Sequence, residues 1–329
     1  MINQRFYPLF RQVFFELEKN LRIWNCDQAH ARQIHRALDK LRENFFEDKV
    51  FPALMGPWLA WQATGTGVSE QALILLGAAH ALFYAFLDLT DDVEDQDLDR
   101  QAWPAGSEAI AINTGTSLLF LSLLALDRLQ EAEIPTERIA ELRTMFAQAG
   151  WLLTAGQHRD LSSKQGHLLL PEDALRTITL KTGTSVKLYF QSAAHLAGAN
   201  SEVKERLGSL GEQIGILSQI RGDYQNIWGS EISSDLQNQC HTLPVLIGLQ
   251  KSTGEDRERL ELALQRTPYD QAAHTLVRYL LKKVDIRTDL NLWLEKHRQI
   301  AQAQLDQLSQ AGLETHELGL FLQRLKPLD

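Results

Sequence analysis

Five carboxylates lie within eight residues at the end of a long apolar stretch: Asp88, Asp91, Asp92, Glu94 and Asp95. In a helix, the four aspartates are spaced i, i+3, i+4 and i+7 and therefore share one face. Like charges at this spacing repel, so the cluster destabilises its own helix unless a cation binds there. Oxygen ligands without nearby cysteine favour Mg²⁺, which commonly bridges carboxylates and substrate phosphates. A solvated acidic helix end is the alternative interpretation.

Further polar side chains recur later in the chain at helical spacing. Gln157 and Asp160 stand three residues apart, and Lys181 interrupts an otherwise apolar stretch. Lysine is rarely buried without an anionic partner, so we expect one for Lys181, although its ammonium could also extend to water. Arg100, which follows the acidic cluster, could reach an anion bound by the metal. The Gln157–Asp160 pair could equally be an ordinary polar pair.

The segment 219–226 carries a similar pattern. Gln219, Asp223 and Asn226 are spaced i, i+4 and i+7, with Arg221 between them. One helix face would then present a carboxylate and two amides. Taken with the earlier clusters, this spacing predicts a cavity in which metal ligands and cations converge on a diphosphate.

The composition favours a helical protein and argues against a nucleic-acid-binding protein and a membrane-spanning one. The 329 residues are 44% hydrophobic with only 20 glycines and 9 prolines, which favours helix over strand. The net charge of −9 argues against a nucleic-acid-binding protein. Two cysteines without metal-binding spacing, Cys26 and Cys240, favour a cytoplasmic location. The apolar stretches 73–87 and 118–126 are too short for a membrane span, so we expect no transmembrane segment and interpret both as buried core helices.

Apolar residues recur with the period of a helix along the whole chain, and no segment of useful length shows the alternation of a strand. A single all-α domain over residues 1–329 is therefore expected. The predicted helices cover residues 7–46, 51–62, 70–95, 107–131, 136–161, 171–196, 201–228, 243–251, 257–265, 269–284 and 290–309.

These motifs resemble those of the trans-type polyprenyl diphosphate synthases, which are class I isoprenoid synthases, over residues 49–244. The most specific element is Asp-Asp-x-x-Asp followed by four residues and an arginine, here Asp91, Asp92, Asp95 and Arg100. The supporting elements are the segments 156–160, 181–182, 219–226 and 235–244. Five such matches in the family's order make the resemblance specific.

The resemblance implies a helical bundle with a deep central apolar cavity, usually in a homodimer. Its aspartate-rich segments would hold Mg²⁺ against the diphosphate of an allylic substrate, because cations stabilise the charge on the leaving group. The implied metal ligands are Asp91, Asp92, Asp95, Asp160, Asp223 and Asn226. The implied diphosphate ligands are Arg100, Gln157, Lys181 and Arg221, and Asp91, Asp92, Asp95 and Lys181 would be the catalytic residues.

Chain length in elongating members is set four and five residues before the first aspartate of the motif, here at Leu87 and Phe86. These residues are expected to form the floor of the cavity and to limit the length of the allylic substrate. Phe86 could equally be an ordinary core residue.

Several positions depart from the chain-elongating members, in which cations hold isopentenyl diphosphate. Phe51 stands at an arginine position beside Lys49, Tyr84 at a histidine position and Gln101 at a second arginine position. A diphosphate needs several charge-assisted donors, so we expect the isopentenyl diphosphate site to be lost. In the second aspartate-rich segment, Gly222 replaces the first aspartate.

The sequence therefore predicts a Mg²⁺-dependent enzyme that ionises an allylic prenyl diphosphate and passes the prenyl group to an acceptor other than isopentenyl diphosphate, such as a peptide tryptophan or a small molecule. Three alternatives stay open. They are terpene-synthase-like cyclisation or hydrolysis, ordinary short-chain elongation of the geranylgeranyl or farnesyl type, and a non-catalytic partner subunit.

Overall fold

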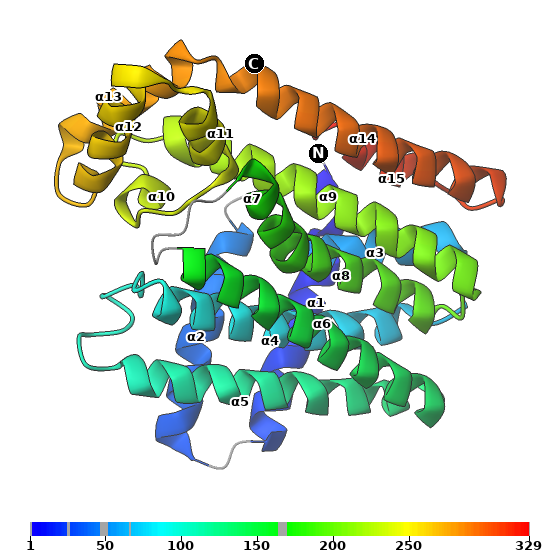
Figure 1. Ribbon diagram of the computed structural model, residues 1–329. Coiled ribbons are helices and arrows are strands. Elements are labelled where there is room, and N and C mark those ends of the chain that lie inside the picture. Colours follow the sequence, from blue (N-terminus) through cyan, green and yellow to red (C-terminus); the bar gives the residue numbers. More distant parts are fainter. Residues whose placement is uncertain (1, 25–26, 47–51, 66, 164–169, 329) are drawn as a thin grey trace. The chain divides into compact units, whose positions relative to one another are not determined.

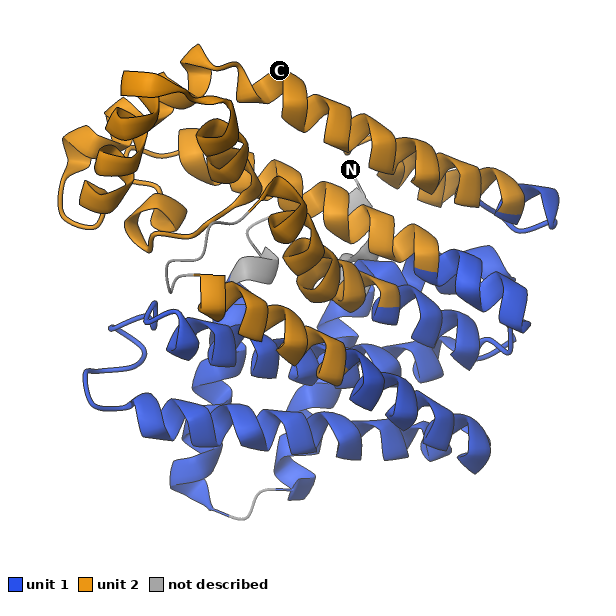
Figure 2. Cartoon of the chain, viewed as in Figure 1, with its two compact units in different colours: residues 1–149, 188–208, 308–315 blue, residues 150–187, 209–307, 316–329 orange. Residues whose placement is uncertain are grey.

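The computed structural model describes residues 2–24, 27–46, 52–65, 67–163 and 170–328. The described residues form helices and contain no strand (Figure 1), which confirms the predicted all-α class. The chain divides into two compact units (Figure 2): unit 1 comprises residues 1–149, 188–208 and 308–315, and unit 2 comprises residues 150–187, 209–307 and 316–329. The single domain stays a prediction. Cys26, Lys49 and Phe51 lie outside the described residues.

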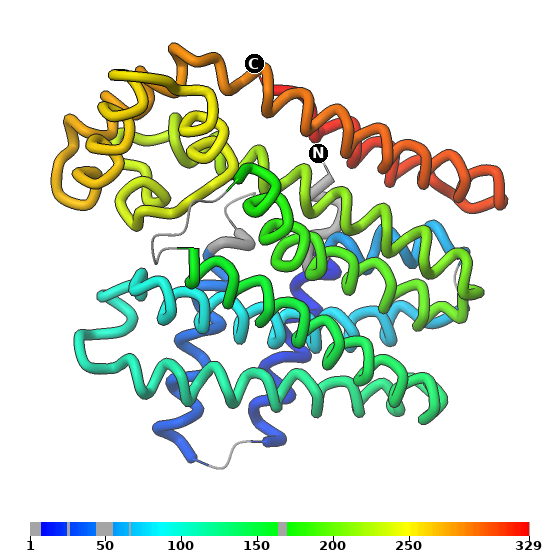
Figure 3. Tube along the Cα trace, in the orientation of Figure 1, coloured from blue at the N-terminus to red at the C-terminus, as the bar shows by residue number. Residues whose placement is uncertain are grey.

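Unit 1 is built around α4 (Glu70–Glu94), which starts where the Ser69 hydroxyl accepts a hydrogen bond from the Ala72 amide at 3.3 Å. Helix α4 runs antiparallel to α5 along its length (Figure 3) and also contacts α1, α2 and α3. The other elements that begin in this unit are α1 (Ile2–Trp24), α2 (Gln28–Phe46), α3 (Pro52–Thr64), α5 (Glu108–Asp127), the 3₁₀ turn η1 (Arg128–Ala132), α6 (Thr136–Ser163) and α9 (Ser201–Trp228).

The prediction of one continuous helix over 7–46 is wrong, because the chain forms α1 and α2 instead. The Asp27 carboxylate accepts a hydrogen bond from the His30 amide at 2.8 Å. This is the contact of a helix N-cap, which satisfies an amide that has no partner inside the helix. Helix α2 therefore starts afresh after Asp27, in a new direction.

One turn in unit 2 departs from α geometry. The predicted helix 171–196 contains a π-helical turn, η2 (Thr179–Gly183), between α7 (Pro171–Ile178) and α8 (Thr184–Leu196). The remaining elements are α10 (Ser234–Gln237), α11 (Leu243–Lys251), α12 (Gly254–Arg266), α13 (Gln271–Lys283), α14 (Ile286–Gln310) and α15 (His316–Leu322). The short helices α10 and α15 were not predicted.

The two most apolar helices differ in how much of their surface the protein covers. Both α4 and the stretch 108–132 are long and apolar enough to cross a membrane by length and composition, and 78% and 44% of their most apolar windows are buried inside the protein. The burial of α4 confirms the prediction of a core helix. The same prediction for 118–126 is only half right, because Leu118 is buried whereas Phe120 is 60% exposed. The cytoplasmic location stays a prediction.

A histidine lies inside the core of unit 1. The fully buried ring of His80 donates from Nε2 to the Ser192 hydroxyl at 2.7 Å, and Ser192 in turn donates to the Tyr189 carbonyl. The ring also stacks on Phe146, with 4.7 Å between ring centroids. Burial lowers the pKa of His80 to about 3, so the imidazole stays neutral at physiological pH.

Replacing His80 by glutamine is expected to weaken the pH dependence of stability. The unfolded chain binds a proton at His80 below about pH 6.5, whereas the folded chain does not until about pH 3. Stability is therefore lost as the pH falls between these values, by up to about 1.4 kcal/mol per pH unit. Urea unfolding at pH 6.5, 5 and 4 should show a smaller loss for the variant than for the wild type. An equal loss in both, or the same change in the exposed control His158→Gln, contradicts this assignment.

Candidate active site

The acidic cluster lies at the C-terminal end of α4. The helix ends at Glu94, Asp95 is its C-cap, and no basic residue stands in its last turn. The side chains of Asp88 and Asp92 are 28% and 22% exposed, so both are partly withdrawn from water. Carboxylates at a helix C-terminus oppose the helix dipole and repel one another. This end of α4 therefore requires positive charge.

Lys40, from α2, supplies positive charge to two of these aspartates. Its Nζ lies 2.6 Å from Asp92 Oδ2 and 2.9 Å from Asp88 Oδ2. Burial lowers the pKa of Lys40, but the two carboxylates outweigh burial and raise it to about 12. Lys40 was not predicted, because the sequence Asp39-Lys40 in an amphipathic helix is typical of a solvated surface.

Burial and neighbouring charges also act on Asp92 and Tyr84. Burial raises the pKa of Asp92 to about 6, with Asp88 adding to the rise and Lys40 opposing it. Tyr84, one turn before Asp88, donates a long hydrogen bond of 3.4 Å to Asp88 Oδ1. Burial and the charge of Asp88 raise the pKa of Tyr84 well above its usual value, so Tyr84 remains a neutral phenol.

Arg100 lies beyond the helix end and is half-exposed. Its Nη1 lies 2.7 Å from Glu108 Oε1, at the start of α5. The guanidinium is thus held within the loop that links α4 to α5. Its predicted role as a diphosphate ligand stays a prediction.

Unit 2 brings several of the other predicted residues together. Lys181, in the π-helical turn η2, lies 2.9 Å from Asp160 Oδ2 on α6. This ion pair provides the anionic partner expected for Lys181. Helix α6 can approach the turn because it carries Gly156, where a Cβ would lie only 2.9 Å from the side chains of Leu180 and Lys181. Turns of π geometry occur frequently at functional sites.

A chain of hydrogen bonds links the same turn to α9. The Thr182 hydroxyl donates to Gln219 Oε1 at 2.7 Å, and Gln219 Nε2 donates to Asp223 Oδ1 at 2.7 Å. Burial raises the pKa of Asp223 to about 7, with Asp235 adding to the rise and the hydrogen bond from Gln219 opposing it. Asp223 therefore lies in a buried polar network within unit 2, and its role as a metal ligand stays a prediction.

Gln157 differs from its neighbours in unit 2. Its Nε2 and Oε1 are both buried, and neither has a hydrogen-bond partner among the residues that the structure describes. A buried amide without partners costs about 1–3 kcal/mol per group. Gln157 thus has the property expected of a group that binds a ligand or an ordered water.

Asn226 and Arg221 contact other parts of unit 2. Asn226 Oδ1 accepts hydrogen bonds from the Ser233 hydroxyl at 2.6 Å and the Asp235 amide at 3.1 Å, which fixes the turn after α9. Arg221 Nη1 donates to the Lys326 carbonyl near the chain end. The roles predicted for both residues, a metal ligand and a diphosphate ligand, stay predictions.

The donor set fits Mg²⁺ only if substrate completes the coordination. Within the described ranges, no three His, Cys, Asp or Glu side chains converge closely enough to hold a metal ion by themselves. Mg²⁺ is, however, usually bound by one or two carboxylates together with waters and substrate phosphates. The partly buried aspartates of α4 fit that donor set.

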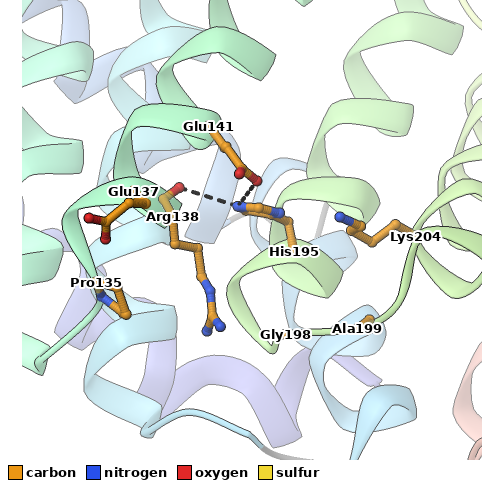
Figure 4. Close-up of a pocket in the computed structure, with 8 residues that line it drawn as sticks. All are labelled: Pro135, Glu137, Arg138, Glu141, His195, Gly198, Ala199 and Lys204. Atoms are coloured by element: carbon orange, nitrogen blue, oxygen red, sulfur yellow. Dashed lines mark hydrogen bonds and ion pairs between the residues drawn. The ribbon is translucent and has the colours of Figure 1, made fainter.

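A polar cavity of about 300 Å³ in unit 1 contains none of the predicted site residues. There, Arg138 Nη1 donates to the Leu196 carbonyl at 3.0 Å. Figure 4 shows the second contact, in which His195 Nε2 donates to the Arg138 carbonyl at 3.2 Å. Glu141 approaches the same ring nitrogen at 3.4 Å. These contacts join the end of α8 to the start of α6. The polar residues of this cavity therefore stabilise the ends of the two helices.

Comparisons with known proteins place the chain in a family. Residues 54–283 match the polyprenyl synthetase family. The short chain isoprenyl diphosphate synthase of Methanothermobacter thermautotrophicus is 26% identical over 222 residues, which cover 64% of this chain and 66% of that protein. The geranylgeranyl pyrophosphate synthase of Eremothecium gossypii is 26% identical over 233 residues, which cover 65% and 71%.

Solved structures also match this chain. A geranylgeranyl pyrophosphate synthase from Corynebacterium glutamicum, complexed with isoprenyl diphosphate and magnesium, matches with a TM-score of 0.75 at 16% identity over 91% of this chain and 92% of that one. A likeness at this identity shows a common fold.

The matched residues and the all-α fold define the family. The chain belongs to the polyprenyl synthetase family, which confirms the resemblance found in the sequence. It spans about two thirds of the length of the curated relatives above.

Replacing Gly156 by alanine is expected to destabilise the protein by roughly 1–3 kcal/mol, because the added methyl group overpacks the contact between α6 and Lys181. Gly222→Ala is the matched control: no atom lies within 4 Å of its added Cβ, and removing a helical glycine should stabilise by up to about 1 kcal/mol. Urea unfolding measures both changes. Equal effects of the two substitutions, or a neutral Gly156→Ala, contradict the close approach.

Proposed function

We propose that the protein is a Mg²⁺-dependent prenyltransferase that ionises an allylic prenyl diphosphate. The observation that carries this proposal is the retained aspartate-rich end of α4, where Asp88 and Asp92 are partly buried, in a chain of the polyprenyl synthetase family. Ligands for Mg²⁺ would come from Asp91, Asp92 and Asp95. The solved Corynebacterium relative, which contains isoprenyl diphosphate and magnesium, supports this assignment.

The residues of this chain would act on the leaving group. Bound Mg²⁺ supplies positive charge to the departing diphosphate. Within unit 2, Lys181 is held in place by Asp160 and would bind diphosphate, and the buried amide of Gln157 would hold a diphosphate oxygen. Arg100 would add a second cation. Each contact stabilises charge that grows as the C–O bond breaks.

The allylic cation formed in this step must be shielded from water until it is captured. Phe86 and Leu87 are half-buried, and the Phe86 ring lies near Phe83, with 6.0 Å between ring centroids, and against Gly115 of α5. This packing is compatible with a cavity floor and equally with a core position. We keep the cavity and its floor as part of the proposal.

For the acceptor, we propose a molecule other than isopentenyl diphosphate, such as a peptide tryptophan or a small molecule. Tyr84 stands where elongating members carry a histidine, and it is a neutral phenol hydrogen-bonded to Asp88. The exposed Gln101 stands where they carry an arginine. At these two positions a diphosphate acceptor would meet a phenol and an amide in place of two cations, and the nearby ammonium of Lys40 is already paired with Asp88 and Asp92. Ordinary chain elongation is the second candidate, because the named relatives are chain-elongating synthases.

Incubation with Mg²⁺ and geranyl, farnesyl or geranylgeranyl diphosphate tests the proposal. We expect diphosphate release that does not require isopentenyl diphosphate and that rises when a suitable acceptor, such as a tryptophan-containing peptide, is added. Asp91→Asn should slow this release roughly a hundredfold or more, the usual cost of removing a group that stabilises transition-state charge. The exposed Asp97→Asn is the matched control.

Longer prenyl diphosphates as products would contradict the proposed acceptor and establish chain elongation. A hydrocarbon or alcohol formed without an acceptor would indicate cyclisation or hydrolysis. No release from any substrate, with Asp91→Asn indistinguishable from the wild type, would contradict the prenyltransferase and favour the partner subunit.

We further propose that the chain forms a homodimer through α5. The helix carries no charged residue between Glu108 and Asp127, yet Ile112, Phe120 and Leu124 are 56%, 60% and 42% exposed, and Phe120 and Leu124 stand one turn apart. An exposed apolar face of this kind marks an interaction site, and a face without charge is self-complementary.

Phe120→Glu is expected to convert the dimer into a monomer, because a second copy would bury the new charge without a partner. Leu262→Glu, equally exposed at 60% but on α12, should remain dimeric. Analytical ultracentrifugation measures both. A wild-type monomer, or a dimer that survives Phe120→Glu, would contradict this interface.

A further inference from the structure

The contact of Lys40 with the acidic cluster joins two helices that are distant in sequence. Its ammonium nitrogen lies within 2.9 Å of both Asp88 and Asp92, which stand one turn apart on α4. The two carboxylates together bind a single positive charge, which comes from α2. We call this pair of aspartates the clamp. Removal of that charge would leave two half-buried carboxylates facing one another.

The clamp is accessible. The Lys40 side chain is 43% exposed, more than either carboxylate. Lysine carries its charge on a flexible four-carbon stem, so its ammonium can leave the carboxylates without a change in the helices. A hydrated divalent cation can therefore compete for Asp92.

We propose that Lys40 is a positioning residue that acts as the resident counter-ion of Asp88 and Asp92 and competes with Mg²⁺ for this end of α4. In the absence of substrate, Lys40 neutralises part of the cluster and keeps the affinity for Mg²⁺ low. Metal binding then depends on the diphosphate, which supplies the missing ligands. The inference rests on the proposed function for its consequence in catalysis, although the competition itself is a property of the protein without substrate.

Isothermal titration of Mg²⁺ into the substrate-free protein tests the competition. Lys40→Met should raise the affinity for Mg²⁺ roughly tenfold, because it removes a charge that opposes the metal at about 4 Å or less. Asp88→Asn should lower the affinity for Mg²⁺, because Lys40 then pairs with Asp92 alone. Lys40→Arg should restore the wild-type value, and Arg32→Gln, an exposed residue of α2, should leave it unchanged.

Thermal unfolding in EDTA and in Mg²⁺ provides the second measurement. Lys40→Met should lower the melting temperature in EDTA and recover much of the loss in Mg²⁺, since the metal replaces the missing charge. An equal loss in both conditions, with unchanged affinity for Mg²⁺, would overturn the proposal in favour of a purely structural ion pair.

An unchanged affinity for Mg²⁺ with a raised KM for the allylic diphosphate would overturn the proposal in a different way, since Lys40 would then bind substrate directly. If Lys40→Met does not fold, the same titrations on Lys40→Gln, which also removes the charge, decide the question. If no substrate is turned over, the proposed function fails, while the titrations still show whether Lys40 competes with the metal.

Discussion

Repulsion between carboxylates at the C-terminal end of α4 constrains the rest of the site. Asp88 and Asp92 lie one turn apart where the helix dipole is also unfavourable for negative charge. Lys40 relieves part of this repulsion and ties α2 to α4 within unit 1. Burial, with Asp88 adding to the effect, raises the pKa of Asp92 to about 6. In the proposed function, a divalent cation would bind at this end of α4 and a diphosphate would complete its coordination.

Unit 2 positions its polar groups mainly by close approach of backbones. Gly156 admits the side chain of Lys181, and a Cβ at Gly215 would lie 2.6 Å from the Thr182 carbonyl. Helices α6 and α9 can therefore pack tightly on the π-helical turn, which aligns Lys181 with Asp160 and Thr182 with Gln219. The result is a fixed set of donors and acceptors in which Gln157 keeps its amide for another partner.

Local sequence patterns were sufficient to predict most of the helices and the family. The predicted helices 201–228 and 243–251 coincide with α9 and α11, because their caps and apolar periods agree. The break at Asp27 and the π-helical turn were missed, since one depends on a side-chain cap and the other on tertiary packing. Lys40 could not be found, because its partners lie 48 and 52 positions away and its own helix resembles a solvated surface. Asn226 and Arg221 matched a family pattern, yet here they contact a turn and the chain end.

The central claim is that the end of α4 is a metal and diphosphate site whose occupancy is set by Lys40. The most direct test is a crystal structure with Mn²⁺ and a non-hydrolysable allylic diphosphate analogue. The anomalous signal of Mn²⁺ locates the metal in it. The account predicts Mn²⁺ bound to carboxylates of the segment 91–95 and to the diphosphate, with Lys40 still in contact with Asp88. Diphosphate bound without metal at this segment, or metal bound only elsewhere in the chain, would contradict it.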